Sequence, residues 1–195
     1  MSRTKERTRT RIMDAAYVLF RERGYTRVNV DEISAAAGVT KRTLYSHFES
    51  RDTLLEAVLE AQHMMAFASF QTFGRKLSGD PLAVVKNFFQ ELRKWSSKPR
   101  FAGSGFTRLA MELADLPGHP ARRIASVHKK LLEGHLVEVL KKAGLAEAER
   151  HGRQIWILAE RVMALAVIHG DRNYSSAAEQ AAVKLIGGPK SSRAR

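Results

Sequence analysis

The sequence predicts an all-α fold of about nine helices, and three observations support this. Apolar residues recur at intervals of three and four, the spacing that places side chains on one face of a helix. Capping residues, glycines and prolines interrupt that pattern at intervals typical of helix ends. No stretch alternates apolar and polar residues as a half-exposed strand would. We expect two helical domains, residues 1–70 and 71–188, followed by a flexible tail at 189–195.

The first predicted helix occupies residues 12–20. Its apolar residues Ile12, Ala16 and Phe20 lie three to four positions apart or at multiples of that spacing, so they share one face. Gly24 follows two arginines, and cations before a glycine are typical of a helix end.

Three further helices with clear capping signals complete the first domain. Asn29 can cap the second helix, Glu32 lies three residues later as in a capping box, and Gly38 can end that helix in the left-handed conformation. Thr40 can cap the third helix and Ser50 the fourth. The first domain therefore contains four helices, of which the first three form a compact core.

Five further helices are expected in the second domain. They are separated by proline and glycine clusters, of which residues 116–120 form the clearest break. The penultimate helix is apolar on more than one side, so we expect it to be buried on both sides. The predicted helical segments are 81–98, 106–111, 124–140, 155–167 and 177–186.

Composition and charge restrict the class of protein. The chain has 33 Lys and Arg against 20 Asp and Glu, a net charge of +13 that attracts polyanions. It has no cysteine, which excludes disulfides and thiolate chemistry and is compatible with a reducing cytoplasm, where we expect the protein to act. No signal-peptide region and no run long enough to span a membrane is present.

The sequence predicts no enzyme, no cofactor and no metal. It lacks the motifs of zinc peptidases, serine hydrolases, P-loop nucleotide binding and dinucleotide binding. The histidines are scattered, and His128 and His135 are separated by about 10.5 Å along a helix, too far to share one ion.

Residues 28–47 are predicted to form a helix-turn-helix. Two short helices joined by a tight glycine-containing turn place the second helix in the major groove of DNA, with its first residues at the base edges. The side chains at the start and on the outer face of this second helix can all hydrogen-bond or carry charge. The predicted DNA contacts of this helix are Thr40, Lys41, Arg42, Thr43, Tyr45, Ser46 and His47.

A basic segment precedes the first predicted helix. Residues 3–11 contain five cationic residues and one glutamate, a balance of 5 − 1 = +4. We expect this segment to act as an arm along a phosphate strand or in the adjacent minor groove, with Arg3, Lys5 and Arg7 as DNA contacts.

Residues 15–55 closely resemble one family of regulators. The matching strings are A-A-x-x-L-F at 15–20, V-D-E-I-S-A-A-A-G-V-T-K-R-T-L-Y-S-H-F at 30–48 and S-R-D-T-L-L at 50–55. They resemble the DNA-binding domain of the TetR family. The resemblance implies that residues 40–47 are the recognition helix, that Tyr45 and His47 contact the DNA backbone, and that Ser50 or Arg51 touches phosphate. It also implies a homodimer on operator DNA, with later helices that dimerise and hold a small-molecule effector.

The second domain supplies candidate residues for both of these roles. Aromatic and sulfur-containing side chains of the middle helices are candidates for an effector pocket, and alanines of the last helix permit close approach to a partner subunit. The predicted pocket residues are Phe88, Phe89, Trp95, Phe101, Phe106, Met111 and Trp156, and the predicted dimer interface is Trp156, Ile157, Ala164, Ile168, Ala177, Ala181 and Leu185.

The leading hypothesis is a repressor that a small-molecule effector releases from its operator. Activation through the same domain remains open, as does a DNA-coating protein driven by net charge without sequence preference. A basic protein that docks on anionic membranes would need a large apolar patch beside its cations.

Overall fold

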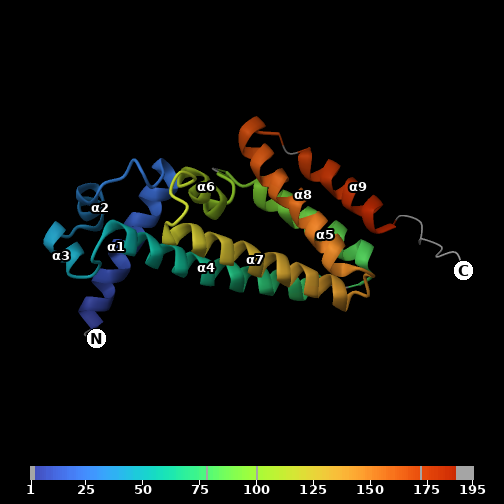
Figure 1. The fold of residues 1–195 in the computed structure, drawn as a ribbon, viewed down its shortest axis with the longest axis horizontal. Coiled ribbons are helices and arrows are strands. Elements are labelled where there is room, and N and C mark those ends of the chain that lie inside the picture. The colour runs from blue at the N-terminus through green and yellow to red at the C-terminus, as the bar shows by residue number, and fades with distance from the viewer. Residues whose placement is uncertain (1–2, 78, 100, 172, 188–195) are drawn as a thin grey trace, which may run out of the picture. The chain divides into compact units, whose positions relative to one another are not determined.

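The computed structural model describes residues 3–77, 79–99, 101–171 and 173–187. Within these ranges the chain forms nine α-helices and no strand, so the predicted all-α class is confirmed (Figure 1). The predicted tail at 189–195 lies outside the described residues. The helices are α1 (Arg3–Arg23), α2 (Val30–Ala37), α3 (Lys41–Tyr45), α4 (Arg51–Lys76), α5 (Pro81–Ser96), α6 (Gly105–Glu112), α7 (Pro120–Lys142), α8 (Ala148–His169) and α9 (Tyr174–Gly187).

The helices group into two compact units, and each unit is formed by two separate stretches of the sequence. The described residues of the first unit fall within 1–66 and 105–128, and those of the second fall within 67–104 and 129–187. The expected boundary after residue 70 falls inside α4, which contributes to both units, as does α7. The α6 segment therefore packs with the first four helices, although it comes much later in the sequence.

Two apolar clusters form the core of the first unit. One contains residues of all four helices α1, α2, α3 and α4, and it is centred on Ile12, Ile33 and Leu44, none of which is exposed. The other packs Tyr25 and Leu55 against apolar residues of α6 and of the first turns of α7. Its members on the later segment are Phe106, Leu109, Leu113, Ala121 and Ala125.

The second unit has one larger core, in which α5 and α8 pack against α9 (Figure 1). Aromatic rings fill much of it: Phe88 lies edge-on to Phe89 with ring centroids 5.3 Å apart, and Phe70 lies edge-on to Trp156 at 6.2 Å. Edge-to-face pairs at such distances are favourable arrangements of aromatic rings. No helix in the described ranges is long and apolar enough to cross a membrane.

The prediction that α1 begins near residue 12 is wrong, because the helix begins at Arg3. The first turns carry no apolar face, so the periodicity that indicates a helix is absent from their sequence. Arginine, lysine and glutamate nevertheless have good helix propensity. The hydroxyls of Thr8 and Thr10 donate hydrogen bonds to the carbonyls of Thr4 and Glu6, each at 3.1 Å.

Candidate nucleic-acid interface

The α2 helix is held at both ends by local interactions. The Asn29 side chain accepts a hydrogen bond from the Glu32 amide at 3.0 Å, and the Glu32 carboxylate accepts one from the Asn29 amide at 2.9 Å. These reciprocal bonds form the predicted capping box. Gly38 ends the helix at φ 62°, a left-handed conformation that glycine adopts without strain. The predicted helix-turn-helix turn is therefore confirmed.

The α3 helix has only five residues and presents a polar outer face. The Thr40 hydroxyl caps it by accepting a hydrogen bond from the Thr43 amide at 3.1 Å. Leu44 is completely buried and anchors the helix to the core, whereas Tyr45 is 46% exposed. Exposed side chains on this face belong to Thr40, Lys41, Arg42, Tyr45 and Ser46, and Thr43 and His47 are half-buried.

Polar contacts order several of these side chains. The Lys41 ammonium lies 3.0 Å from an Asp31 carboxylate oxygen. The hydrogen bond to Asp31 and the attraction of its charge raise the pKa of Lys41, so this side chain remains a cation. The Ser46 hydroxyl donates a hydrogen bond to the Thr43 carbonyl at 2.7 Å. The first turn of α3 thus combines hydroxyl groups and positive charge on one exposed surface.

The cationic residues before Ile12 belong to a helix and not to an extended arm. Arg3, Lys5 and Arg7 are exposed on the first turns of α1. Further along the same helix, the Arg11 guanidinium donates hydrogen bonds to the carbonyls of Ala37 and Gly38 at 2.5 and 3.1 Å. The basic end of α1 is therefore tied to the α2–α3 turn, which places its cations in the same unit as α3.

Arg51, a predicted phosphate contact, has a role within the first unit. Its guanidinium donates a hydrogen bond to the Val28 carbonyl at 2.8 Å and lies 4.2 Å from the centroid of the Tyr25 ring. The side chain is half-buried. Arg51 therefore stabilises the chain between α1 and α2 and differs from the exposed cations of α1 and α3.

The predicted pocket residues are divided between the two units. Phe88, Phe89 and Trp156 belong to the core of the second unit, where Phe101 packs against them. The ring centroids of Trp95 and Phe101 lie 5.0 Å apart. Phe106 and Met111 lie on α6 in the first unit, where Phe106 is buried and Met111 is 75% exposed.

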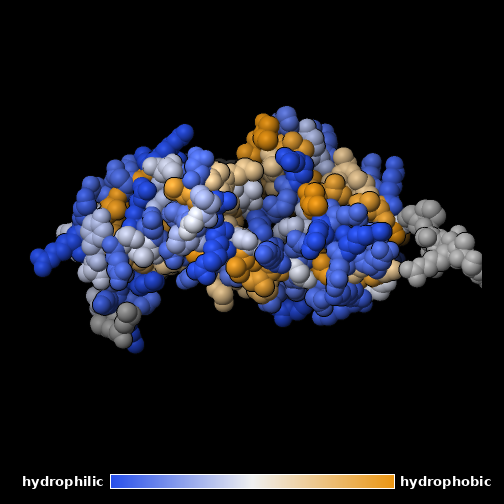
Figure 2. All heavy atoms as spheres, viewed as in Figure 1, coloured by the Kyte–Doolittle hydropathy of each residue, from blue (hydrophilic) through white to orange (hydrophobic). Residues whose placement is uncertain are grey.

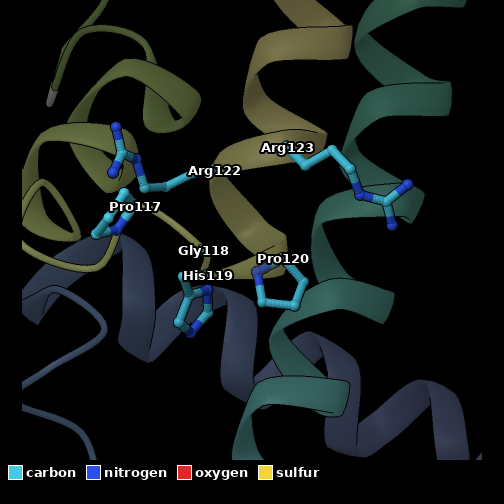
Figure 3. Close-up of a pocket in the computed structure, with 6 residues that line it drawn as sticks. All are labelled: Pro117, Gly118, His119, Pro120, Arg122 and Arg123. Carbon is cyan, nitrogen blue, oxygen red and sulfur yellow. The ribbon is translucent and has the colours of Figure 1, made fainter.

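A polar pocket of about 450 Å³ lies at the connection between α6 and α7 (Figure 3). Its lining contains none of the seven predicted pocket residues. Arg122 and Arg123 point in opposite directions from the first turn of α7, Arg122 toward the α6 segment and Arg123 toward α4. The six lining residues are Pro117, Gly118, His119, Pro120, Arg122 and Arg123.

The predicted dimer interface includes an exposed apolar face of α8 and α9. Ile157 and Ile168 are 61% and 67% exposed, and Leu185 is 39% exposed. Figure 2 shows hydrophobic side chains on the surface over these two helices. Ala177 is also exposed, and Ala164 and Ala181 are half-buried. Trp156 is only 8% exposed and belongs to the core, so it does not share this face.

Two residues of α6 with a clear structural role escaped the sequence analysis of the DNA-binding domain. Glu112 accepts hydrogen bonds from the amides of Tyr25 and Thr26. Arg108 donates a hydrogen bond to the Arg21 carbonyl at 3.2 Å. Because 86 to 87 residues separate the partners in each case, spacing along the chain carries no sign of these contacts.

The geometry defines the first unit as a helix-turn-helix domain, and comparison with known proteins finds matches to this domain. Residues 12–58 match the model of bacterial regulatory proteins, tetR family. The chain is 32% identical over 81 residues to the HTH-type transcriptional regulator AcrR of Shigella flexneri, a match covering 42% of this chain and 38% of that protein. It is 41% identical over 61 residues to the transposon Tn10 TetC protein of Escherichia coli, covering 31% of each chain. The matched stretch thus spans about a third of these relatives.

Solved structures extend the likeness to the whole fold. A TetR-family transcriptional regulator from Streptomyces coelicolor is 25% identical, with a TM-score of 0.80 over 92% of this chain and 95% of that one. The reduced form of Escherichia coli NemR shares the fold at 19% identity, with a TM-score of 0.78 over 92% of this chain and 96% of its own. The match of residues 12–58 to the tetR family model and the fold shared with TetR-family structures agree with the resemblance that the sequence predicted. The relatives are named as regulators, in agreement with the expectation that the chain is not an enzyme.

Proposed function

We propose that the protein is a sequence-specific DNA-binding transcription regulator that acts as a homodimer. One observation carries the proposal: the first turn of α3 exposes hydrogen-bonding and cationic side chains while Leu44 anchors the helix in the core. A short helix held this way presents its N-terminal side chains as a fixed surface, which suits the edges of base pairs in a major groove.

The proposed contacts divide by chemistry. Arginine and lysine side chains pair with guanine, so Lys41 and Arg42 are assigned to base edges. Tyr45 and His47 are assigned to phosphates, together with Thr40, Thr43 and Ser46, whose hydroxyls suit either partner. The exposed cations Arg3, Lys5 and Arg7 on α1 add contacts that strengthen binding on any sequence. Arg51 supports this surface through the Val28 carbonyl.

The homodimer is proposed from the apolar face of α8 and α9. Ile157, Ile168 and Leu185 are exposed large apolar residues on two neighbouring helices, and twofold pairing of these helices would bury each of them twice. A dimer also serves recognition, because one α3 reads only a few base pairs. Two copies read half-sites spaced by about 34–36 Å or a multiple of that distance.

Repression with release by an effector is the form of regulation we propose. One similar protein, from Rhodococcus jostii, is named the transcriptional repressor KstR2, and it is 38% identical over 55 residues. The aromatic side chains of the second unit, Phe88, Phe89, Phe101 and Trp156, are suited to an apolar effector. An effector that binds one conformation of the dimer better than the other shifts the population toward it.

Selection of DNA by the purified protein tests the function. We expect the wild-type chain to enrich one palindromic sequence from a random duplex library. Lys41→Ala and Tyr45→Ala should each weaken binding to that duplex by roughly fivefold to a hundredfold, the effect of losing one base or phosphate contact. Lys184→Ala removes the same charge from α9 and should leave affinity unchanged.

Other outcomes would contradict parts of the proposal. If the wild-type protein enriches no sequence and its affinity falls with salt equally on every duplex, it binds DNA through net charge alone. If the enriched site raises transcription of a reporter when the protein is added, the protein is an activator. A strictly monomeric protein at working concentrations would contradict the dimer.

A further inference from the structure

The α1–α2 turn of the first unit is held by a carboxylate from α6. Glu112 uses both of its carboxylate oxygens: Oε2 accepts a hydrogen bond from the Tyr25 amide at 3.1 Å, and Oε1 accepts from the Thr26 amide at 2.7 Å and the Thr26 hydroxyl at 2.6 Å. We call this group, Glu112 with Tyr25 and Thr26, the turn cap. Its three bonds satisfy two backbone donors that lie outside any helix.

Gly24 permits the close approach that the turn cap requires. Its φ of +86° lies in the left-handed region, a backbone conformation that residues other than glycine rarely adopt. A Cβ atom at this position would lie 2.9 Å from Oε1 of Glu112. The backbone conformation at position 24 therefore requires glycine. The Glu112 carboxylate also occupies the space that a side chain at this position would fill.

Charged groups surround the turn cap on each element that packs against it. Arg108, one turn earlier on α6, attracts the carboxylate and donates to the Arg21 carbonyl at the end of α1. On α4, Asp52 accepts a hydrogen bond from the Tyr25 hydroxyl, and the Arg51 guanidinium lies over the Tyr25 ring. At the start of α7, His119 Nε2 lies 3.6 Å from Asp52 Oδ2, and Figure 3 shows its ring beside α7.

Glu112 is ionised at neutral pH. Burial raises the pKa of its carboxyl, but the hydrogen bonds from Thr26 and Tyr25 and the charge of Arg108 outweigh burial, so the pKa lies below its ordinary value of 4.5. Burial, followed by the hydrogen bond to Asp52, raises the pKa of Tyr25 to about 12, so the phenol keeps its proton and remains a donor. The turn cap is therefore intact near neutral pH and is lost as pH falls through the pKa of Glu112.

We propose that Glu112 is a positioning residue for DNA recognition, which holds the α1–α2 turn so that α2 and α3 keep a fixed orientation relative to the cations of α1. This inference rests on the proposed function. The turn is the direct covalent link between α1 and α2, and its residues Tyr25 and Val28 are buried in two different clusters of the first unit. In the part of the chain that the structure describes, the hydrogen bonds of Glu112 go to Tyr25 and Thr26 and not to a proposed DNA contact, so Glu112 acts through this link.

A pair of matched variants tests the proposal. Glu112→Gln keeps the shape of the side chain but replaces one acceptor oxygen with an NH₂ donor. This donor would face the amide donor of Tyr25 or Thr26, so that hydrogen bond could not form. Glu22→Gln removes the same charge from an exposed position on α1 of the same unit. The DNA probes are the duplex enriched by the wild-type protein and a scrambled duplex of equal length.

The expected result separates positioning from charge and from folding. Glu112→Gln should weaken binding to the enriched duplex by about tenfold or more relative to Glu22→Gln, as expected for lost hydrogen bonds to a charged group. Binding to the scrambled duplex should be equal for the two variants. The wild-type amide resonances of Tyr25 and Thr26 should shift as pH falls below 4.5, and Glu112→Gln should abolish that titration.

Two results would overturn the inference, and they are distinct from failure of the proposed function. If Glu112→Gln binds the enriched duplex as Glu22→Gln does, Glu112 has no positioning role although the protein still recognises DNA. If the Tyr25 and Thr26 resonances do not follow the protonation of Glu112, the turn cap does not form in solution. If the wild-type protein enriches no duplex, the proposed function fails and the role in recognition fails with it, while the titration still decides whether the turn cap exists.

Discussion

The α2–α3 region of the first unit and the α8–α9 region of the second are stabilised in different ways. The helices α2 and α3 have eight and five residues, and capping side chains within three positions of their ends hold them. The helices α8 and α9 have 22 and 14 residues and pack through a shared aromatic and aliphatic core. Isolated helices as short as α2 and α3 are unstable in water, so caps and a few core anchors must hold them.

The difference explains which surfaces remain for binding. Because caps and the single anchor Leu44 hold α3, the rest of its side chains can be polar and exposed. On α8 apolar residues occur both on the face toward the core and among the exposed positions, as Ile155 and Ile157 illustrate. The first pattern suits a polar partner such as DNA, and the second suits another protein surface.

The largest expected effect comes from removing the anchor of α3. Leu44→Ala should destabilise the first unit by about 2–5 kcal/mol, the usual cost of this change at a buried site. DNA binding should be lost, because the five-residue helix has few other apolar contacts. Amide hydrogen exchange would locate the loss in the first unit. Leu136→Ala, at an equally buried site of the second unit, should cost as much stability. It should leave the α3 amides protected from hydrogen exchange at neutral pH.

A charge on the apolar face of α8 should break the proposed dimer. Ile168→Glu places a carboxylate where a twofold interface would contain it twice, so the dissociation constant should rise by roughly a hundredfold or more. Sedimentation measures the effect, and circular dichroism checks that the helices persist. Leu116→Glu alters an exposed leucine of the first unit and should leave the dimer intact. A dimer unaffected by Ile168→Glu would show that subunits pair elsewhere.

The smallest expected effect concerns the cap of α2. Asn29→Ala removes the bond to the Glu32 amide and should cost about 0.5–2 kcal/mol. Urea unfolding measures the loss. Asn29→Ser retains a capping oxygen and should recover most of the stability, whereas equal losses for the two variants would show that the cap contributes little.

Sequence reasoning succeeded where the partners are close along the chain. The Asn29–Glu32 capping box, the Thr40 cap and the left-handed Gly38 each involve residues within a few positions, and the structure contains all three. Helix periodicity also placed Ile12, Ala16 and Phe20 on one face, and all three belong to or pack against the same apolar cluster. In each case one residue type at one spacing has a single favourable local geometry.

Sequence reasoning does not decide between roles where a side chain could serve either of two partners. Arg51 suits a phosphate as well as it suits a carbonyl, and only the folded chain brings the Val28 carbonyl within reach. Met111 shares the helical spacing of α6 with Phe106, but it lies on the outer face. The first turns of α1 contain no apolar residue that would reveal a helix. Residue type alone does not distinguish these alternatives.

The discontinuous make-up of the first unit has a consequence for synthesis of the chain. Tyr25, Leu55 and Leu59 receive their apolar cover from Phe106, Leu109 and Leu113, and Glu112 closes the turn after α1. A nascent chain that has only passed residue 66 therefore exposes these apolar side chains. The unit that carries the helix-turn-helix can reach its final state only after the ribosome has released residues up to 128.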